Sequence, residues 1–109
     1  MKLQDDFYAM LGLARRAGAV LCGSFAVQKG LRAGKIRLVV ADEALSQRAR
    51  QELEALCHSC GRELMFAGPD GHLGQAVGKQ SKVVGVTKQA FSQRLKEIYH
   101  AQRRGGETV

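Results

Sequence analysis

The sequence of 109 residues has one proline, no tryptophan, only three cysteines and no long apolar run. Because no run approaches the roughly 20 apolar residues that cross a bilayer, a transmembrane helix is excluded. Three cysteines are an odd number and too few for a disulfide-stapled secreted fold. The N-terminal segment also carries aspartates where a secretory signal is basic. We therefore expect a cytoplasmic protein in a reducing compartment, with no membrane partner.

Acidic residues are missing from two long stretches of the chain. None occurs in residues 7–41 or 71–96, which contain six and five basic residues respectively. The intervening residues 42–70 hold six acids and three bases, and the formal net charge of the chain is +7. This exclusion of acids favours a nucleic-acid face, because phosphates repel carboxylates. The competing interpretation is that the cations only solvate the surfaces of helices.

Hydrophobic residues make up 45% of the chain and charged residues 25%, which is the composition of an ordinary globular domain. The length suits one compact unit with one core, without a deep enclosed cavity. We expect a single domain over residues 1–100 and a frayed C-terminal tail over residues 101–109. Function should then lie on the surface, without a small-molecule substrate.

Hydrophobic spacing predicts helices near residues 3–18, 24–34, 46–61, 73–78 and 87–100, the third capped by Ser46 and ended by Gly61. Strands are predicted at residues 36–41, 64–67 and 83–86, and residues 20–22 form a further short apolar segment. The predicted class is α/β: a single-domain three-layer α-β-α sandwich with a central mostly parallel or mixed sheet of about four strands. Gly30 inside a helix costs about 1 kcal/mol relative to alanine, so a neighbour should pack closely there.

Cys57-His58-Ser59-Cys60 has the CxxC spacing used by zinc and redox sites. A structural zinc needs four ligands, yet the chain has no second CxxC pair, and Cys22 is a lone thiol. A redox CxxC opens a helix, where the dipole lowers the thiol pKa, whereas this one ends its predicted helix. We expect Cys57 and Cys60 to be small core residues without a metal or cofactor. Metal or redox chemistry is the alternative.

No motif in the chain indicates catalysis. Residues 68–74 are rich in glycine but fit neither G-x-G-x-x-G nor G-x-x-x-x-G-K-[ST], so we interpret them as a turn. No set of serine, histidine and acid, and no pair of carboxylates, shares a motif. The sequence therefore predicts no catalytic residues and a protein that is not an enzyme.

The strongest constellation begins at Gly23-Ser24, ahead of the second predicted helix. A helix N-terminus has unpaired N–H groups and a partial positive charge. A glycine that lets a phosphate approach, followed by Lys29 about one turn later, makes an anion-binding corner. Arg32 and Lys35 extend the same positive charge. The alternative is an ordinary N-cap with solvated lysines.

Several segments occur in a collinear order that covers residues 3–98. They are Leu11-Gly12-Leu13-Ala14-Arg15-Arg16-Ala17-Gly18, then Gly23 with Val27 and Lys29, then residues 32–41 and residues 73–79. Together they resemble the seven-Ae and thirty-e superfamily of ribosomal proteins, and in particular its small bacterial YlxQ-type branch. The fold of that family is also an α-β-α sandwich.

The resemblance implies binding of structured RNA without catalysis, typically a kink-turn or related internal loop with tandem sheared G·A pairs, in ribosomal RNA or on the ribosome. In the family, the glycine before the second helix and the first turn of that helix approach the bent strand. A lysine one turn further in contacts a base or the backbone, and a loop before the last strand presses on a flipped nucleotide. The RNA-binding residues expected here are Gly23, Ser24, Phe25, Ala26, Lys29, Arg32, Lys35, Arg15, Arg16, Lys79, Lys82 and Val83.

Two positions depart from the family pattern. Strong readers of kink-turns usually carry Asn or Lys and then Glu or Gln where this chain has Phe25 and Ala26. Neither side chain can hydrogen-bond the exposed edges of sheared guanines. Phe25 can instead stack on an unpaired base or anchor the start of the helix in the core. An exposed Phe25 also suits the competing function, a protein-interaction module that retains an ancestral RNA-binding fold.

Overall fold

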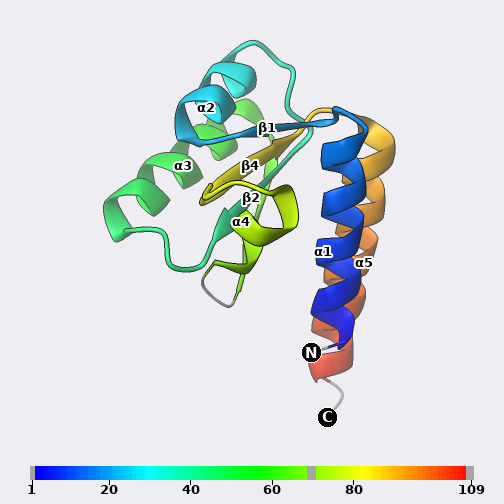
Figure 1. The fold of residues 1–109 in the computed structure, drawn as a ribbon. Helices are drawn as coiled ribbons and strands as arrows, with labels where there is room; N and C mark the ends of the chain where they lie inside the picture. The colour runs from blue at the N-terminus through cyan, green and yellow to red at the C-terminus, as the bar shows by residue number, and fades with distance from the viewer. Residues whose placement is uncertain (1, 69–70, 108–109) are drawn as a thin grey trace.

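A computed structural model describes residues 2–68 and 71–107, with side chains for residues 5–68 and 71–102. The chain alternates helices and short strands (Figure 1). In order, the elements are α1 (Lys2–Arg16), β1 (Val20–Cys22), α2 (Ser24–Arg32), β2 (Leu38–Asp42), α3 (Gln47–Cys60), β3 (Glu63–Ala67), α4 (His72–Val77), β4 (Val83–Val86) and α5 (Gln89–Glu107). The apolar segment at residues 20–22 is thus a strand of the sheet.

The sheet is mixed, with strand order β1-β4-β2-β3. Strands β2 and β3 run parallel, with Leu38 opposite Glu63. Strand β4 is antiparallel to both of its neighbours, because Val86 lies opposite Val20 on β1 and opposite Leu38 on β2. Helix α4 has only six residues, about 9 Å of helix, so it does not carry the chain back across the sheet. Strand β4 therefore starts at the end where β3 stops.

Two layers of helices cover the sheet, which confirms the three-layer sandwich (Figure 1). Helices α1, α4 and α5 pack on one face, where Leu38 and Val40 of β2 point. Helices α2 and α3 pack on the other face, against Val39 and Ala41. Because successive side chains of a strand point to opposite faces, β2 is apolar throughout and buried on both sides.

Helix α2 lies unusually close to the sheet at two glycines. A Cβ on Gly30 would lie 3.0 Å from carbons of Ile36 and of Leu21. A Cβ on Gly85 of β4 would lie 2.5 Å from the Ile36 Cδ1 atom. The expectation that a neighbour packs closely against Gly30 is therefore confirmed, and Ile36 fills the space that the two missing side chains leave.

The observed ends of the helices match the predicted ends in part. Ser46 caps α3, its Oγ accepting a hydrogen bond from the Ala49 N–H at 3.2 Å, and Gly61 ends the helix with φ 67°. Helix α5 continues to Glu107, beyond residue 100 where we expected the domain to end. Fraying of this end stays a prediction, and residues 108–109 lie outside the described part of the chain, as do residues 69–70 of the expected turn.

Cys57 is buried and Cys60 is half-buried at the end of α3, so only the first is a full core residue. Burial and the neighbouring Cys60 raise the pKa of Cys57 to about 11, so its thiol stays protonated near neutral pH. That protonation disfavours redox chemistry, which needs the thiolate. Among the side chains described, those of residues 5–68 and 71–102, no three His, Cys, Asp or Glu form a group that could hold a metal ion. No described helix is long and apolar enough to span a bilayer.

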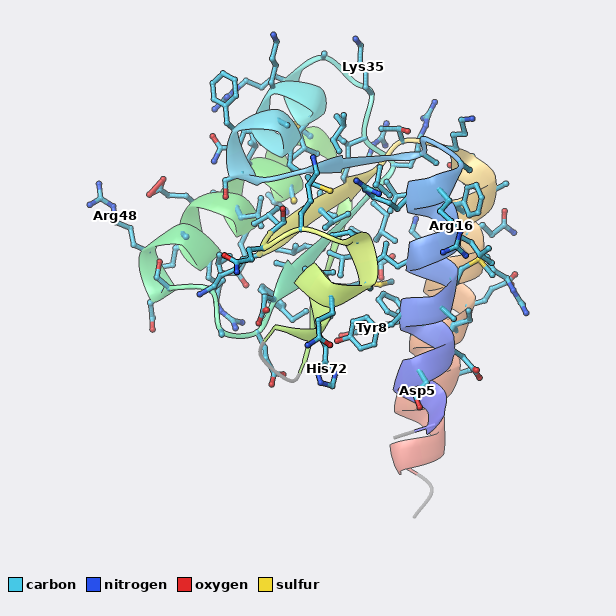
Figure 2. All side chains as sticks on the ribbon, viewed as in Figure 1. Asp5, Tyr8, Arg16, Lys35, Arg48 and His72 are labelled. Carbon is cyan, nitrogen blue, oxygen red and sulfur yellow. The ribbon has the colours of Figure 1, made fainter. Side chains whose placement is uncertain are left out.

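Tyr8 of α1 is expected to make the stability of the fold depend on alkaline pH. Its hydroxyl donates a hydrogen bond to the Gly68 carbonyl at 2.8 Å, and its ring forms a T-shaped pair with the His72 ring (Figure 2). Burial, and then the charges of Asp42 and Glu43, raise the pKa of Tyr8 to about 12. The folded state favours the neutral phenol. The stabilisation that Tyr8 gives the fold is therefore full below pH 10 and is lost as the pH rises through about 12.

Two measurements test this. The tyrosinate absorbance of the native protein minus that of Tyr8→Phe should show a phenol that ionises near pH 12. Denaturation of the two proteins at rising pH should show that the advantage of the native chain shrinks above pH 10. A difference spectrum with its midpoint at the ordinary tyrosine pKa of about 10 would contradict the described burial.

Candidate nucleic-acid interface

The start of α2 is set by Gly23, which is the N-cap residue, with φ 95° and ψ 150°. Only glycine adopts this backbone conformation without strain. Ser24 is the first residue of the helix, and no side chain caps it. The first turn therefore presents backbone N–H groups without a competing side-chain oxygen.

A main-chain hydrogen bond joins this helix start to the start of β4. The Gly23 N–H donates to the Val83 carbonyl at 2.8 Å, next to the β-bridge between Cys22 and Val84. Two segments about 60 residues apart in the sequence thus form one corner of the molecule. The Val83 side chain is 2% exposed and packs in the core against α2 and α3. Val83 therefore positions the corner and its side chain is not free to reach a ligand, while contact of RNA with the Val83 segment stays a prediction.

The loop before β4, residues 78–82, is held from both ends. Gly78 ends α4 with φ 70°, and the Lys79 N–H donates to the Gly74 carbonyl at 3.0 Å. At the other end, the Lys82 carbonyl accepts a hydrogen bond from the Asp42 N–H at 2.8 Å. The loop and α4 border a shallow recess of about 690 Å³, which is lined by Asp42, Gly71, Gly74, Gln75, Gly78, Lys79, Gln80, Ser81 and Lys82.

Asp42 holds this recess in shape. The residue is 1% exposed, and its carboxylate accepts hydrogen bonds from two backbone N–H groups. The bond from Ala44 is 2.8 Å and fixes the turn after β2. The bond from Gly71 is 3.0 Å and fixes the start of α4. Backbone dipoles thus take up the negative charge of the carboxylate, and Asp42 also lines the recess.

A second recess, of about 270 Å³, lies where the first turns of α2 and α3 meet. It is lined by Ser24, Gln28, Leu45, Ser46, Arg48, Ala49, Glu52, Leu53 and Val83. Arg48 extends outward from α3 (Figure 2) and its Nε lies 3.3 Å from the Glu52 carboxylate. The sequence did not indicate that Gln28, Ser46 and Arg48 border one recess, because this depends on the packing of α3 beside α2.

The side chains at the corner are exposed to solvent, so a ligand on the surface can reach them. Phe25 is 81% exposed, so it is not a core anchor of the helix start. Lys79 and Lys82 of the loop are exposed as well, and so is Lys29, which lies in the last turn of α2. The ion pairs among the described residues join other side chains, so no described carboxylate neutralises these lysines. Charge and an aromatic ring are thus both available to a ligand here.

Other predicted residues lie away from this corner. Arg32 is the last residue of α2, about 12 Å along the helix from Ser24, and Lys35 follows beyond the C-cap residue Ala33. Arg15 and Arg16 end α1, just before Ala19, whose carbonyl accepts a hydrogen bond from the Thr87 N–H beyond the end of β4. In Figure 2, Arg16 and Lys35 lie apart from Arg48. The structure therefore does not gather all the predicted cations into one groove.

The chain is similar to several known proteins. The model of the ribosomal protein L7Ae/L30e/S12e/Gadd45 family matches residues 5–96. RNA-binding protein YlxQ of Bacillus subtilis (strain 168) is 30% identical over 91 residues, which are 83% of this chain and 91% of the relative. A solved protein of unknown function from Bacillus halodurans C has a TM-score of 0.80 at 30% identity, over 84% of this chain and 94% of that one.

A more distant structure has the same fold. The 15.5kD RNA binding protein of Giardia lamblia superposes with a TM-score of 0.74. The match covers 90% of this chain and 85% of that chain, at 20% identity. The three-layer arrangement and its mixed sheet are thus shared with a protein whose sequence has diverged widely.

Proposed function

Because the chain belongs to the ribosomal protein L7Ae/L30e/S12e/Gadd45 family, we propose that it is a non-catalytic protein that binds structured RNA. The observation that supports this most is the Gly23 to Val83 hydrogen bond, which holds the first turn of α2 beside β4 and the loop that precedes it. Both segments expected to contact RNA lie at this corner. The similarity to a protein named for RNA binding supports the same function.

The RNA that fits this corner is a kink-turn or a related internal loop, in ribosomal RNA or a ribosome-associated RNA of the cytoplasm. Lys29, Lys79 and Lys82 supply exposed cations for phosphates. Phe25 and Ala26 offer no hydrogen bonds to the edges of sheared guanines. The exposed Phe25 ring offers a stacking surface instead. We therefore propose that the preferred loop carries an unpaired base at the first turn of α2.

Two substitutions test this assignment. Lys29→Gln should reduce the slope of log affinity against log salt by about 0.7 to 0.9, the effect of one phosphate contact.

Phe25→Ala should cost about 1 to 3 kcal/mol of binding to an RNA with an unpaired loop base, and much less with a plain duplex. Fluorescence anisotropy across a salt series gives both numbers. Arg94→Gln removes an exposed cation of α5 and is the matched control.

The alternative function, a protein-interaction module, is favoured by one observation, the 81% exposure of Phe25. Such an apolar side chain can anchor a protein partner, for example on the ribosome. In that case Phe25→Ala abolishes the protein complex and leaves RNA affinity unchanged. A native chain whose RNA binding does not respond to salt would contradict the RNA proposal itself.

A further inference from the structure

A second group of exposed cations lies at the opposite end of the sheet from the Gly23 corner. We call Arg15, Lys35, Arg37 and Lys88 the far-end cluster; all four are exposed. Main-chain hydrogen bonds bring their segments together where β4 ends. The Arg37 N–H donates to the Val86 carbonyl at 2.7 Å, and the Thr87 N–H donates to the Ala19 carbonyl at 2.8 Å.

The charge at this end is not neutralised by nearby acids. Arg62 adds a fifth cation at this end of the sheet. Its Nε donates a hydrogen bond to the Ile36 carbonyl at 2.7 Å, which holds the guanidinium close to Lys35 and Arg37 in the chain. The carboxylate at the start of β3, Glu63, is engaged with α5, 4.0 Å from the Lys96 ammonium and 3.1 Å from the His100 ring. Among the described residues, no member of the far-end cluster takes part in an ion pair.

The chemistry of this surface fits phosphates better than a protein partner. Protein interfaces have an apolar core and are depleted in lysine. The large hydrophobic side chains exposed among the described residues are Leu13 and Phe25, and neither belongs to the cluster. Gly18 and Gly34 flank the cluster with φ 70° and 73°, and no atom lies within 4 Å of the place a side chain would take. The backbone is therefore open to a closely approaching sugar-phosphate chain.

We propose that the far-end cluster is a second phosphate-binding surface, which holds the backbone of an RNA helix independently of sequence. Strand β4 separates it from the Gly23 corner by about 13 Å, at roughly 3.3 Å per residue. One chain can therefore contact a loop at one end of the sheet and a helical segment at the other. That the ligand is RNA rests on the proposed function, whereas the surface itself rests on its own charges and contacts.

The test uses a blunt RNA duplex of about 16 base pairs, the length that a double-stranded RNA-binding domain spans. The variant K35Q/R37Q/K88Q should bind the duplex at least tenfold more weakly than the native chain. Its slope of log affinity against log salt should fall by about 2 to 3. The matched control K35R/R37K/K88R keeps every charge at the same positions and should bind as the native chain does.

A measurement on the unaltered protein guards against a folding defect. In amide NMR spectra of the native chain, the duplex should shift the signals of residues 34–38 and 87–89 before those of residues 23–29. The variant K29Q/K82Q separates the two sites, since it should weaken a short-stemmed internal-loop RNA and leave the duplex unaffected. If that variant binds the loop RNA normally while K35Q/R37Q/K88Q loses the duplex, the proposed loop site fails and the far-end surface stands.

Three outcomes would overturn the inference. One is an unchanged salt slope for K35Q/R37Q/K88Q. The second is a set of duplex-induced shifts confined to residues 23–29. The third is binding of polyglutamate with an affinity and a salt slope equal to those of the duplex, which would assign the surface to acidic polypeptides.

Discussion

Asp42→Asn is expected to lower the free energy of unfolding by about 1 to 3 kcal/mol, because the buried carboxylate serves two backbone donors at once. Its two oxygens accept separately from the Ala44 and Gly71 N–H groups. An asparagine has a single acceptor oxygen, so its NH₂ group must face one of these N–H donors. A donor facing a donor in a site that is 1% exposed leaves both without a partner.

The loss should be visible in function as well as in stability. Asp42 ties β2 to the start of α4 and lines the recess beside Lys79 and Lys82. Urea denaturation of Asp42→Asn should give a lower midpoint than the native chain, with weaker binding of the internal-loop RNA. Glu54→Gln makes the same change of charge at an exposed position of α3 and is the control. Equal midpoints for the two variants would refute this account of Asp42.

The second large effect is expected from Gly74→Ala in α4. Alanine in place of a helical glycine normally stabilises by about 1 kcal/mol. Here the new Cβ would lie 2.6 Å from the Lys79 carbonyl oxygen, which is a backbone atom that no side-chain rotation can move aside. Overpacking of this kind costs about 1 to 3 kcal/mol and forces the backbone to shift. We therefore expect a net loss of stability and a displaced loop over residues 78–82.

Two measurements separate the loop displacement from general unfolding. Thermal denaturation gives the change in stability, and amide NMR spectra should show shifts concentrated at residues 79–82. Gln75→Ala alters an exposed neighbour in the same helix and should leave both measurements near the native values. A Gly74→Ala protein more stable than the native chain would show that the loop accommodates the methyl group at no cost.

Local signals in the sequence predicted most of the fold. The uninterrupted apolar run at β2 matched burial on both faces, and Ser46 and Gly61 marked the ends of α3. The direction of β4 was not decided by such signals, since the sequence left a mostly parallel sheet and a mixed one both open. That direction follows from the short length of α4 and from the loop that returns to Asp42, which are tertiary facts.

The candidate site was predicted less completely. The match of two distant segments to a known family indicated that Gly23 lies near residues 78–83, and the Gly23 to Val83 hydrogen bond agrees with this. A count of basic residues along the chain could not tell which end of the sheet each one occupies. Lys82 and Lys88 are six positions apart, yet they lie beyond opposite ends of β4. The two stretches without acidic residues therefore predicted that the surface is positively charged, but not that its cations form two separate groups.

Ile36 packs against both Gly30 and Gly85, so the size of the residue at any one of these positions limits the size at the other two. A bulkier residue at either glycine position needs a shorter one at position 36, or α2 must tilt away from the sheet. These positions should therefore covary among relatives. Such a tilt would move Lys29 and Phe25 relative to the loop before β4, so the spacing between helix and sheet sets the position of the side chains proposed to contact RNA.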